Sequence, residues 1–276
     1  KQLKGGMMCQ DIFVEVGHGP TLIDNNILLS DVSLRFATQG VAMVHNLICG
    51  ALTCVGEGTS WRYTPYHMPH RTEVMGFMTI LHGDDRFYNN IFVQKWPSED
   101  FITMHDSDDG FDSENRRVGT WMFDEYPTYD EWISQFDFTK PADMKKLEPV
   151  HFDHLPVWSE GNVYLNGAKA WKHEKDGFVS SENAKVELTE KDGKYILDTN
   201  IYEILGDFSD RMINTEILGK AFEPEEFFEN PDGTPIRFDS DYFGGHRGAK
   251  VIPGPFAEKE EIGKNVNMST CALNKL

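Results

Sequence analysis

The chain has 276 residues, of which 39% are hydrophobic and 12% aromatic, and its formal net charge is −19 at pH 7. This composition is sufficient for a packed core and argues against disorder. A surface this acidic repels phosphate backbones and disfavours polyanionic substrates, and we therefore expect no nucleic acid partner. Binding of a neutral sugar is not opposed by this charge.

The first predicted element is a strand over residues 11–16. Its β-branched side chains alternate with Phe13 and Glu15, a period of two that gives one buried face and puts Glu15 on the other. A glycine-bounded bend that holds His18 follows. A carboxyl group on a rigid strand beside an aromatic ring and an imidazole is a candidate acid or base, and a solvated Glu on an edge strand is the alternative.

The beginning of the chain is the next feature that bears on its organisation. The sequence starts at Lys1 without a Met and reaches this strand by residue 11. We therefore expect it to begin inside a longer fold. No stretch approaches the roughly 20 apolar residues of a membrane span, so no membrane partner is expected and the compartment stays undetermined.

An asparagine followed by a short β-branched or aromatic run recurs at Asn26, Asn46, Asn90 and Asn162. The first two copies lie 20 residues apart, and the third follows after 44, about two further units. A recurrence of roughly 20 residues fits one turn of a β-solenoid, in which stacked asparagines can form a ladder of side-chain amides. An ordinary all-β sandwich with Asn turns is the alternative.

Residues 96–150 interrupt this pattern. Residues 106–114 form an acidic, Gly-containing loop that could hold calcium but lacks the EF-hand spacing, so we interpret it as solvated. Residues 128–136 predict a short helix, because Thr128 and Glu131 form a capping box before an apolar stripe. We expect this helix to pack on the solenoid as a cover.

Strands are predicted again beyond residue 157, at 163–165, 185–188, 195–197 and 200–204. Asp192-Gly193 predicts a hairpin turn, and residues 223–237 predict a short helix start followed by a turn at 230–233. The chain is therefore divided into solenoid turns carrying the site (1–95), an insertion (96–150), and final turns with a cap (151–276).

The densest group of polar side chains lies between residues 62 and 86. His67, His70 and Arg71 can donate to sugar hydroxyls, and Tyr66 can stack or hydrogen-bond. His67 and His70 are three residues apart with a proline between them, so they offer no helical metal face and we expect neither a metal nor a cofactor. Residues 84–86, Asp-Asp-Arg, precede a strand and predict a turn with an ion pair.

Several reaction classes lack their motifs here. The sequence contains no Gly-x-Ser-x-Gly elbow and no Gly-rich phosphate loop, which leaves carboxylate chemistry. Glycoside hydrolysis uses two carboxyl groups about 5–5.5 Å apart for retention and about 6.5–9.5 Å apart for inversion. Glu15 and Glu73 are the strand-associated glutamates nearest the polar group.

Four ordered motifs carry a resemblance to a known family. They are Asp-Ile-Phe-Val-Glu-Val-x-His-Gly-Pro at 11–20, Gln-Gly-Val-Ala-x-Val-His-Asn at 39–46, Thr-Pro-Tyr-His-x-Pro-His-x-Thr-Glu at 64–73 and Gly-Asp-Asp-Arg-Phe-Tyr-Asn-Asn at 83–90. Together they resemble the β-xylosidases of glycoside hydrolase family 120. The resemblance is looser over 150–245, and 96–150 looks like an insertion.

The resemblance implies an all-β fold: the C-terminal portion of a right-handed parallel β-helix (solenoid) with a helical/loop insertion. It implies retaining removal of xylose from the non-reducing ends of xylo-oligosaccharides, with Glu15 as the general acid/base. The family's nucleophile, an aspartate about one coil earlier, would fall upstream of Lys1. The implied partners are a xylo-oligosaccharide or related neutral glycan and the remaining N-terminal part of the enzyme or a companion chain, and a homo-oligomer is compatible with the sequence.

The expected site therefore has Glu15 as acid/base, Glu73 in reserve, and a set of substrate-binding residues. These binding residues are His18, Tyr66, His67, His70 and Arg71. A β-helix polysaccharide lyase stays open, because Arg71 and Arg86 could serve a uronate. A non-catalytic glycan-binding β-helix is the third class.

Overall fold

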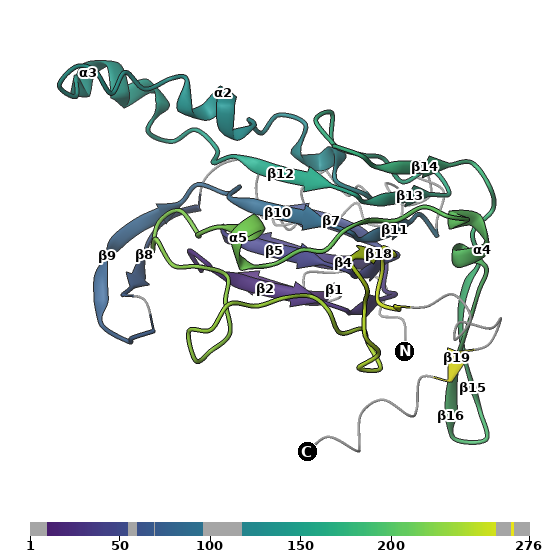
Figure 1. Ribbon diagram of the computed structural model, residues 1–276. Helices are drawn as coiled ribbons and strands as arrows, with labels where there is room; N and C mark the ends of the chain where they lie inside the picture. The colour runs from purple at the N-terminus through teal and green to yellow at the C-terminus, as the bar shows by residue number, and fades with distance from the viewer. Residues whose placement is uncertain (1–9, 55–59, 69, 96–117, 258–265, 268–276) are drawn as a thin grey trace.

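The computed structural model describes residues 10–54, 60–68, 70–95, 118–257 and 266–267. Short parallel sheets form its centre, and hairpins, short helices and long loops surround them (Figure 1). No helix in these ranges has the length and apolar character needed to cross a membrane.

Three parallel sheets stack strands from successive segments of the chain. The first contains β1 (Gln10–Glu15), β4 (Val32–Ala37) and β7 (Ala51–Cys54). The second contains β2 (Thr21–Asp24), β5 (Val41–Val44), β10 (Asp85–Tyr88) and β12 (Val157–Glu160). The third contains β3 (Ile27–Leu28), β6 (Leu47–Ile48), β11 (Ile91–Val93), β13 (Val163–Leu165) and β14 (Phe178–Ser180).

Register aligns like side chains between these strands, because in-register parallel pairing puts each residue above its equivalent. Ile23 pairs with Met43, which in turn pairs with Phe87, and all three lie in the main buried cluster. Phe92 and Tyr164 are also paired, and their rings stack 5.3 Å apart. Burying each such side chain stabilises the fold by about 1.5–3 kcal/mol.

The predicted amide ladder is present, and we call Asn26, Asn46, Asn90 and Asn162 the asparagine ladder. Each side-chain oxygen accepts from the backbone N–H of the preceding ladder residue, at 2.9 Å, 3.0 Å and 2.9 Å along the series. The residue before each ladder position has a positive φ, between 54° and 68°. Asn, His and Gly tolerate that left-handed conformation, which explains the Asn-Asn, His-Asn and Gly-Asn pairs.

Antiparallel pairs make up the other sheets. β8 (Ser60–His67) pairs with β9 (Val74–Ile80), and β17 (Asp210–Arg211) pairs with β18 (Lys250–Val251). β15 (Val186–Lys191), β16 (Lys194–Thr199) and β19 (Val266–Asn267) form the third such sheet. The predicted Asp192-Gly193 turn joins β15 to β16, with both residues at positive φ.

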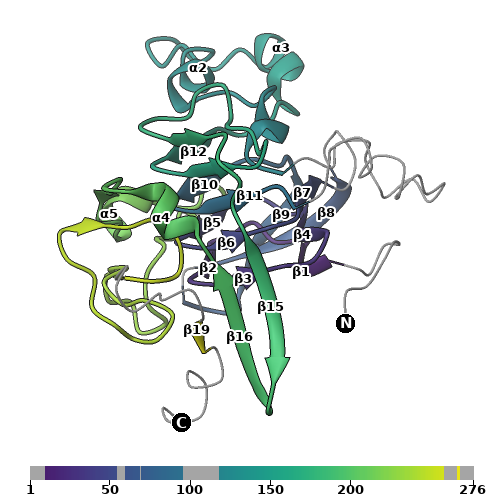
Figure 2. The ribbon, with the colours of Figure 1, turned by 90° about the vertical axis from the view of Figure 1, so that its right-hand side faces the viewer.

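The helices are all short. They are the 3₁₀ turns η1 (Trp121–Phe123) and η2 (Glu148–Val150) and the helices α2 (Tyr129–Ile133), α3 (Met144–Leu147), α4 (Ile201–Leu205) and α5 (Thr215–Leu218). The capping box predicted between Thr128 and Glu131 is confirmed at the start of α2. The predicted packing of this helix holds only at one edge, where the Tyr129 ring of α2 stacks 6.3 Å from the Trp158 ring of β12. It is no cover, because neither α2 nor α3 has a buried residue and both project beyond β12 (Figure 2).

The fold-class prediction was wrong. The described residues form six separate small sheets, three parallel and three antiparallel, accompanied by short helices, and no right-handed parallel β-helix or solenoid is detected in them. The ladder residues are separated by 20, then 44, then 72 positions, so the interval that predicted a solenoid occurs once. A local Asn motif specifies a turn and its amide bonds, but not how the chain connects one turn to the next.

Two element predictions in the last part of the chain were also wrong. The strand expected at 200–204 is α4, and no helix starts within 223–237, where the structure has turns and isolated bridges. Apolar residues of α4 pack against the third parallel sheet, a tertiary contact that periodicity over five residues does not reveal. The acidic loop at 106–114 lies outside the described residues, and the three-part division of the chain stays a prediction.

Candidate active site

The strand predicted to carry the acid/base is present as β1. Exposure alternates along it, so Phe13 and Glu15 are on the exposed face while Ile12 and Val14 pack against the main core. Parallel pairing places Glu15 beside Ala37 of β4. The carboxyl group is therefore carried by a strand of a sheet and lies on the face opposite the apolar interior.

The bend that follows Glu15 is fixed beneath the β8–β9 hairpin. His18 is buried, its Nε2 lies 2.7 Å from the Thr64 hydroxyl, and its ring meets Tyr66 edge-on at 5.9 Å. Burial lowers the pKa of His18, which favours the neutral imidazole. A Cβ at Gly19 would lie 2.5 Å from the Gly40 oxygen, so the backbone of the bend packs without room for a side chain.

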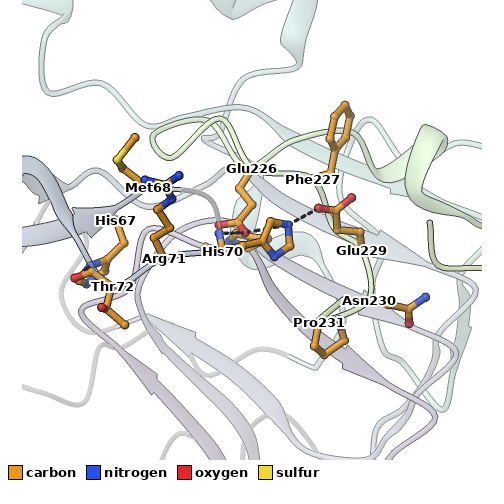
Figure 3. Close-up of a pocket in the computed structure, with 12 residues that line it drawn as sticks. His67, Met68, His70, Arg71, Thr72, Glu226, Phe227, Glu229, Asn230 and Pro231 are labelled. Atoms are coloured by element: carbon orange, nitrogen blue, oxygen red, sulfur yellow. Dashed lines mark hydrogen bonds and ion pairs between the residues drawn. The ribbon is translucent and has the colours of Figure 1, made fainter. Parts of the chain in front are cut away.

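A pocket of about 530 Å³ opens beside this bend, and we call it the hairpin pocket (Figure 3). It lies between the tip of the β8–β9 hairpin and a loop from the last quarter of the chain. Its lining residues are Gly19, Pro20, His67, Met68, His70, Arg71, Thr72, Glu226, Phe227, Glu229, Asn230 and Pro231. Three of the predicted binding residues, His67, His70 and Arg71, are therefore brought together here.

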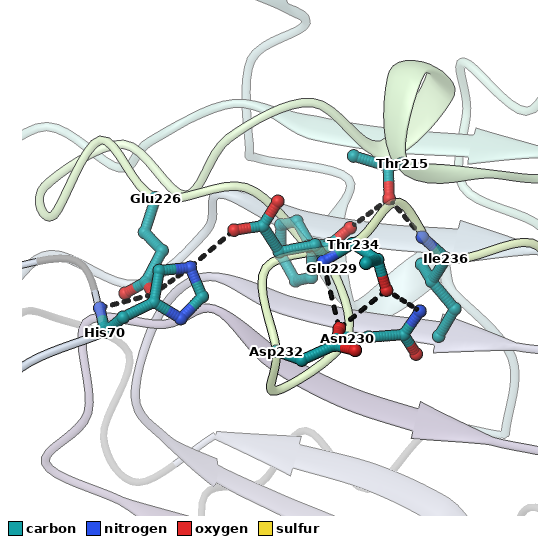
Figure 4. Close-up of polar contacts among 9 residues, drawn as sticks. His70, Thr215, Glu226, Glu229, Asn230, Asp232, Thr234 and Ile236 are labelled. Atoms are coloured by element: carbon teal, nitrogen blue, oxygen red, sulfur yellow. Dashed lines mark hydrogen bonds and ion pairs between the residues drawn. The ribbon is translucent and has the colours of Figure 1, made fainter.

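Two glutamates that sequence reasoning missed hold His70 at the centre of the hairpin pocket. The imidazole Nε2 of His70 lies 2.6 Å from Oε1 of Glu229 and 3.7 Å from Oε1 of Glu226 (Figure 4). The backbone N–H of His70 also donates to Glu226 over 3.1 Å. His70 thus links the hairpin to a loop 156 residues further along the chain.

The loop that carries these glutamates is positioned by buried neighbours. The Thr215 hydroxyl donates to the Phe228 oxygen over 2.7 Å and accepts from the Ile236 N–H over 2.8 Å. Phe228, which lies between the two glutamates in the sequence, is buried, and the Arg86 guanidinium lies 4.7 Å from its ring. The sequence predicted a helix start here, which is absent, and the 230–233 turn, which is present: the Gly233 N–H donates to the Asn230 oxygen over 2.8 Å.

Tyr66 and Glu73, which were also predicted, do not line the hairpin pocket. Tyr66 covers Gly76 across the hairpin, where an added Cβ would lie 2.8 Å from the Tyr66 ring. Glu73 precedes β9 and faces Arg71 across 3.7 Å, with more than 60% of both side chains exposed. These positions make Tyr66 a packing residue of the hairpin and leave Glu73 on the open surface.

The ion pair predicted in residues 84–86 is confirmed, but it is buried. Arg86 lies 2.6 Å from the Asp84 carboxylate and also donates to the backbone oxygens of Leu218 and Lys220. Its guanidinium stacks 4.4 Å from the Trp158 ring. Burial raises the pKa of Asp84 and, more strongly, that of Asp85. This group joins the second parallel sheet to α5 and the residues that follow it.

Comparisons with known proteins place this geometry beside one solved structure. No protein-family model and no curated protein match the sequence. The fold is similar to that of XylC, whose structure was solved as a complex with xylose, with a TM-score of 0.74 and 31% sequence identity. The likeness covers 94% of this chain and 36% of the XylC chain, so this chain spans about a third of that protein's length.

Proposed function

We propose that this chain forms part of a retaining β-xylosidase-like exo-glycosidase, as in glycoside hydrolase family 120, releasing xylose from the non-reducing ends of xylo-oligosaccharides. One observation carries the proposal: the 31% identity to the xylose-complexed XylC over 94% of this chain. Two further features support it. Glu15 is on the exposed face of β1, and the hairpin pocket is lined in part by Gly19, four residues after Glu15. The net charge of −19 fits a neutral substrate.

Glu15 is the general acid/base in this mechanism. An aspartate from outside this segment attacks the anomeric carbon while protonated Glu15 donates to the departing glycosidic oxygen. Ionised Glu15 then removes a proton from the water that hydrolyses the glycosyl-enzyme. A rigid strand suits both steps, since the same carboxyl group must meet first the leaving oxygen and then the water.

The substrate-binding roles divide by exposure. His67, His70 and Arg71 reach the hairpin pocket and supply N–H donors to sugar hydroxyls. His18 and Tyr66 were also predicted to bind substrate. Their packing supports an indirect contribution to substrate binding, in which they fix the bend between Glu15 and the pocket. Glu73 stays the reserve acid/base.

The lyase alternative is weakened by the surroundings of Arg86. A lyase needs an Arg or Lys that contacts a uronate, and Arg86 is 4% exposed with its donors directed at Asp84 and backbone oxygens. Arg71 is exposed and is the remaining candidate for that role. The non-catalytic glycan-binding alternative has no specific observation in its favour.

The test is incubation of the protein, with any companion chain present, with xylobiose and with an activated aryl β-xyloside. We expect release of xylose, with the β-anomer appearing first in proton NMR spectra because retention requires two inversions. The lyase is tested in parallel with a uronate-containing polysaccharide, because β-elimination needs a uronate carboxyl group that xylobiose lacks. An unsaturated, ultraviolet-absorbing product from that polysaccharide would support the lyase instead. Unchanged xylobiose after long incubation would support the non-catalytic alternative and refute the proposal.

A further inference from the structure

Glu226 and Glu229 present partly exposed carboxylates to the hairpin pocket. Their side chains are 20% and 16% exposed, and Oε1 of each faces His70. Among the described residues, no group hydrogen-bonds the second oxygen of either carboxylate. A carboxylate oxygen that no protein group donates to keeps its acceptor sites available for the hydroxyl groups of a ligand.

The opposite wall of the hairpin pocket supplies donors. His67 and Arg71 lie across from the glutamates, with His70 between the two groups (Figure 3). Each sugar hydroxyl can both donate and accept, so vicinal hydroxyls match a wall of carboxylates facing a wall of N–H donors. This mixture of acceptors and donors distinguishes the pocket from a simple acidic patch.

The size of the hairpin pocket and its place in the chain fit a sugar unit. Its volume of about 530 Å³ falls within the roughly 300–1,000 Å³ of small-molecule sites. Gly19 and Pro20 form part of its lining and belong to the bend that follows Glu15. Because His18 fastens that bend to Thr64 of the hairpin, Glu15 and the pocket belong to one packed unit.

We propose that the hairpin pocket binds one sugar unit of the glycan, with Glu226 and Glu229 each accepting a hydrogen bond from one of its hydroxyl groups. The inference rests on the proposed glycosidase function and adds two residues to it. In addition to its proposed binding role, His70 positions both carboxylates, because its imidazole Nε2 contacts Glu229 and its backbone N–H donates to Glu226.

A purely structural clasp between hairpin and loop is the competing explanation, and charge-removing substitutions separate the two. In E226Q and E229Q a side-chain oxygen can still accept from His70, so the clasp is kept while the charge is lost. Charged hydrogen bonds are about twice as strong as neutral ones. We therefore expect the double variant to bind xylobiose roughly tenfold more weakly, with a matching rise in KM and kcat within about threefold.

The matched control is E225Q, which changes an exposed neighbour outside the pocket lining. Binding is measured by calorimetry with xylobiose, and thermal midpoints are recorded for every variant. Affinity equal to wild type in the double variant would overturn the inference whatever the thermal midpoint, and would leave the clasp as the role of the two glutamates. The ¹⁵N shifts of the His70 imidazole in the unaltered protein, followed during xylobiose titration, provide a test that needs no variant; unmoved shifts would also overturn it.

The two proposals fail in different ways. If xylobiose binds in a manner that depends on Glu226 and Glu229 but is never hydrolysed, the glycosidase proposal falls and the sugar site stands. If hydrolysis depends on Glu15 while the double variant keeps wild-type affinity and KM, the sugar site falls and the glycosidase proposal stands.

Discussion

The asparagine ladder and the hairpin pocket are both polar, yet they differ in how completely their polar atoms are paired. The Asn90 amide donates to the Met43 oxygen and to Asn162, and its own oxygen accepts twice from Asn46. In the pocket, Glu226 and Glu229 keep one oxygen each without a partner among the described residues. Pairing stabilises the first region, and spare capacity makes the second available to a ligand.

The largest effect is expected at Glu15, the proposed general acid/base. E15Q cannot donate a proton, so turnover of xylobiose should fall about 10²- to 10⁴-fold. An activated aryl β-xyloside needs less protonation of its leaving group and should lose much less. Steady-state kinetics on both substrates checks this. Rates near wild type for both would show that Glu15 is not the acid/base.

The next effect is on stability, in the fully paired region. N90A removes an amide that makes four hydrogen bonds and leaves buried groups of Asn46 and Met43 unpaired, so we expect a loss of about 3–5 kcal/mol in the free energy of unfolding. N26A, at the half-buried end of the ladder, should cost only about 1 kcal/mol. Urea unfolding of both variants measures the difference, and equal losses would contradict an energetic gradient along the ladder.

A smaller effect depends on pH and concerns the far end of the ladder. Glu174 accepts from the backbone and the amide of Asn162, at 3.0 Å and 3.1 Å, and from the Tyr164 hydroxyl at 2.8 Å. Burial raises the pKa of Glu174 above its ordinary value of 4.5. Its contribution to stability is therefore complete below pH 4.5 and is lost as pH rises through the raised pKa, because the native state holds the proton longer.

Replacement of Glu174 by the uncharged isostere isolates this contribution. E174Q should gain stability relative to wild type as pH increases from 4 to 7, because Gln pays no cost for a buried charge. The measurement is urea unfolding at several pH values. E182Q, at an exposed position, is the control and should show no such trend. A difference between E174Q and wild type that does not vary with pH would contradict the assignment.

The smallest effect is expected on the open surface. E73Q breaks only an exposed ion pair with Arg71 at 3.7 Å, which should change the free energy of unfolding by less than about 0.5 kcal/mol. Its turnover should stay near wild type, because Glu73 does not line the hairpin pocket. A drop comparable to that expected for E15Q would exchange the roles of the two glutamates.

Features encoded by short sequence intervals were predictable. The alternation around Glu15, the amide ladder, the Thr128–Glu131 capping box and the Asp192-Gly193 hairpin turn each depend on residues close in sequence or on one repeated motif. Glu226 and Glu229 were missed because they meet His70 only through a contact 156 residues or more along the chain. The fold-class prediction was wrong for a related reason, since the connections between turns are set by tertiary packing rather than by the recurring Asn motif.

One property of the ladder bears on how such a chain can change. Asn90 and Asn162 are bonded side chain to side chain at 3.0 Å although 72 positions separate them, whereas Asn26 and Asn46 make the equivalent bond across 20. The cost of closing a connecting segment grows only logarithmically with its length. Segments can therefore be gained or lost between neighbouring residues of the asparagine ladder at little thermodynamic penalty. This makes the junctions near residues 94 and 156 suitable places to insert new sequence, while the ladder residues themselves stay constrained.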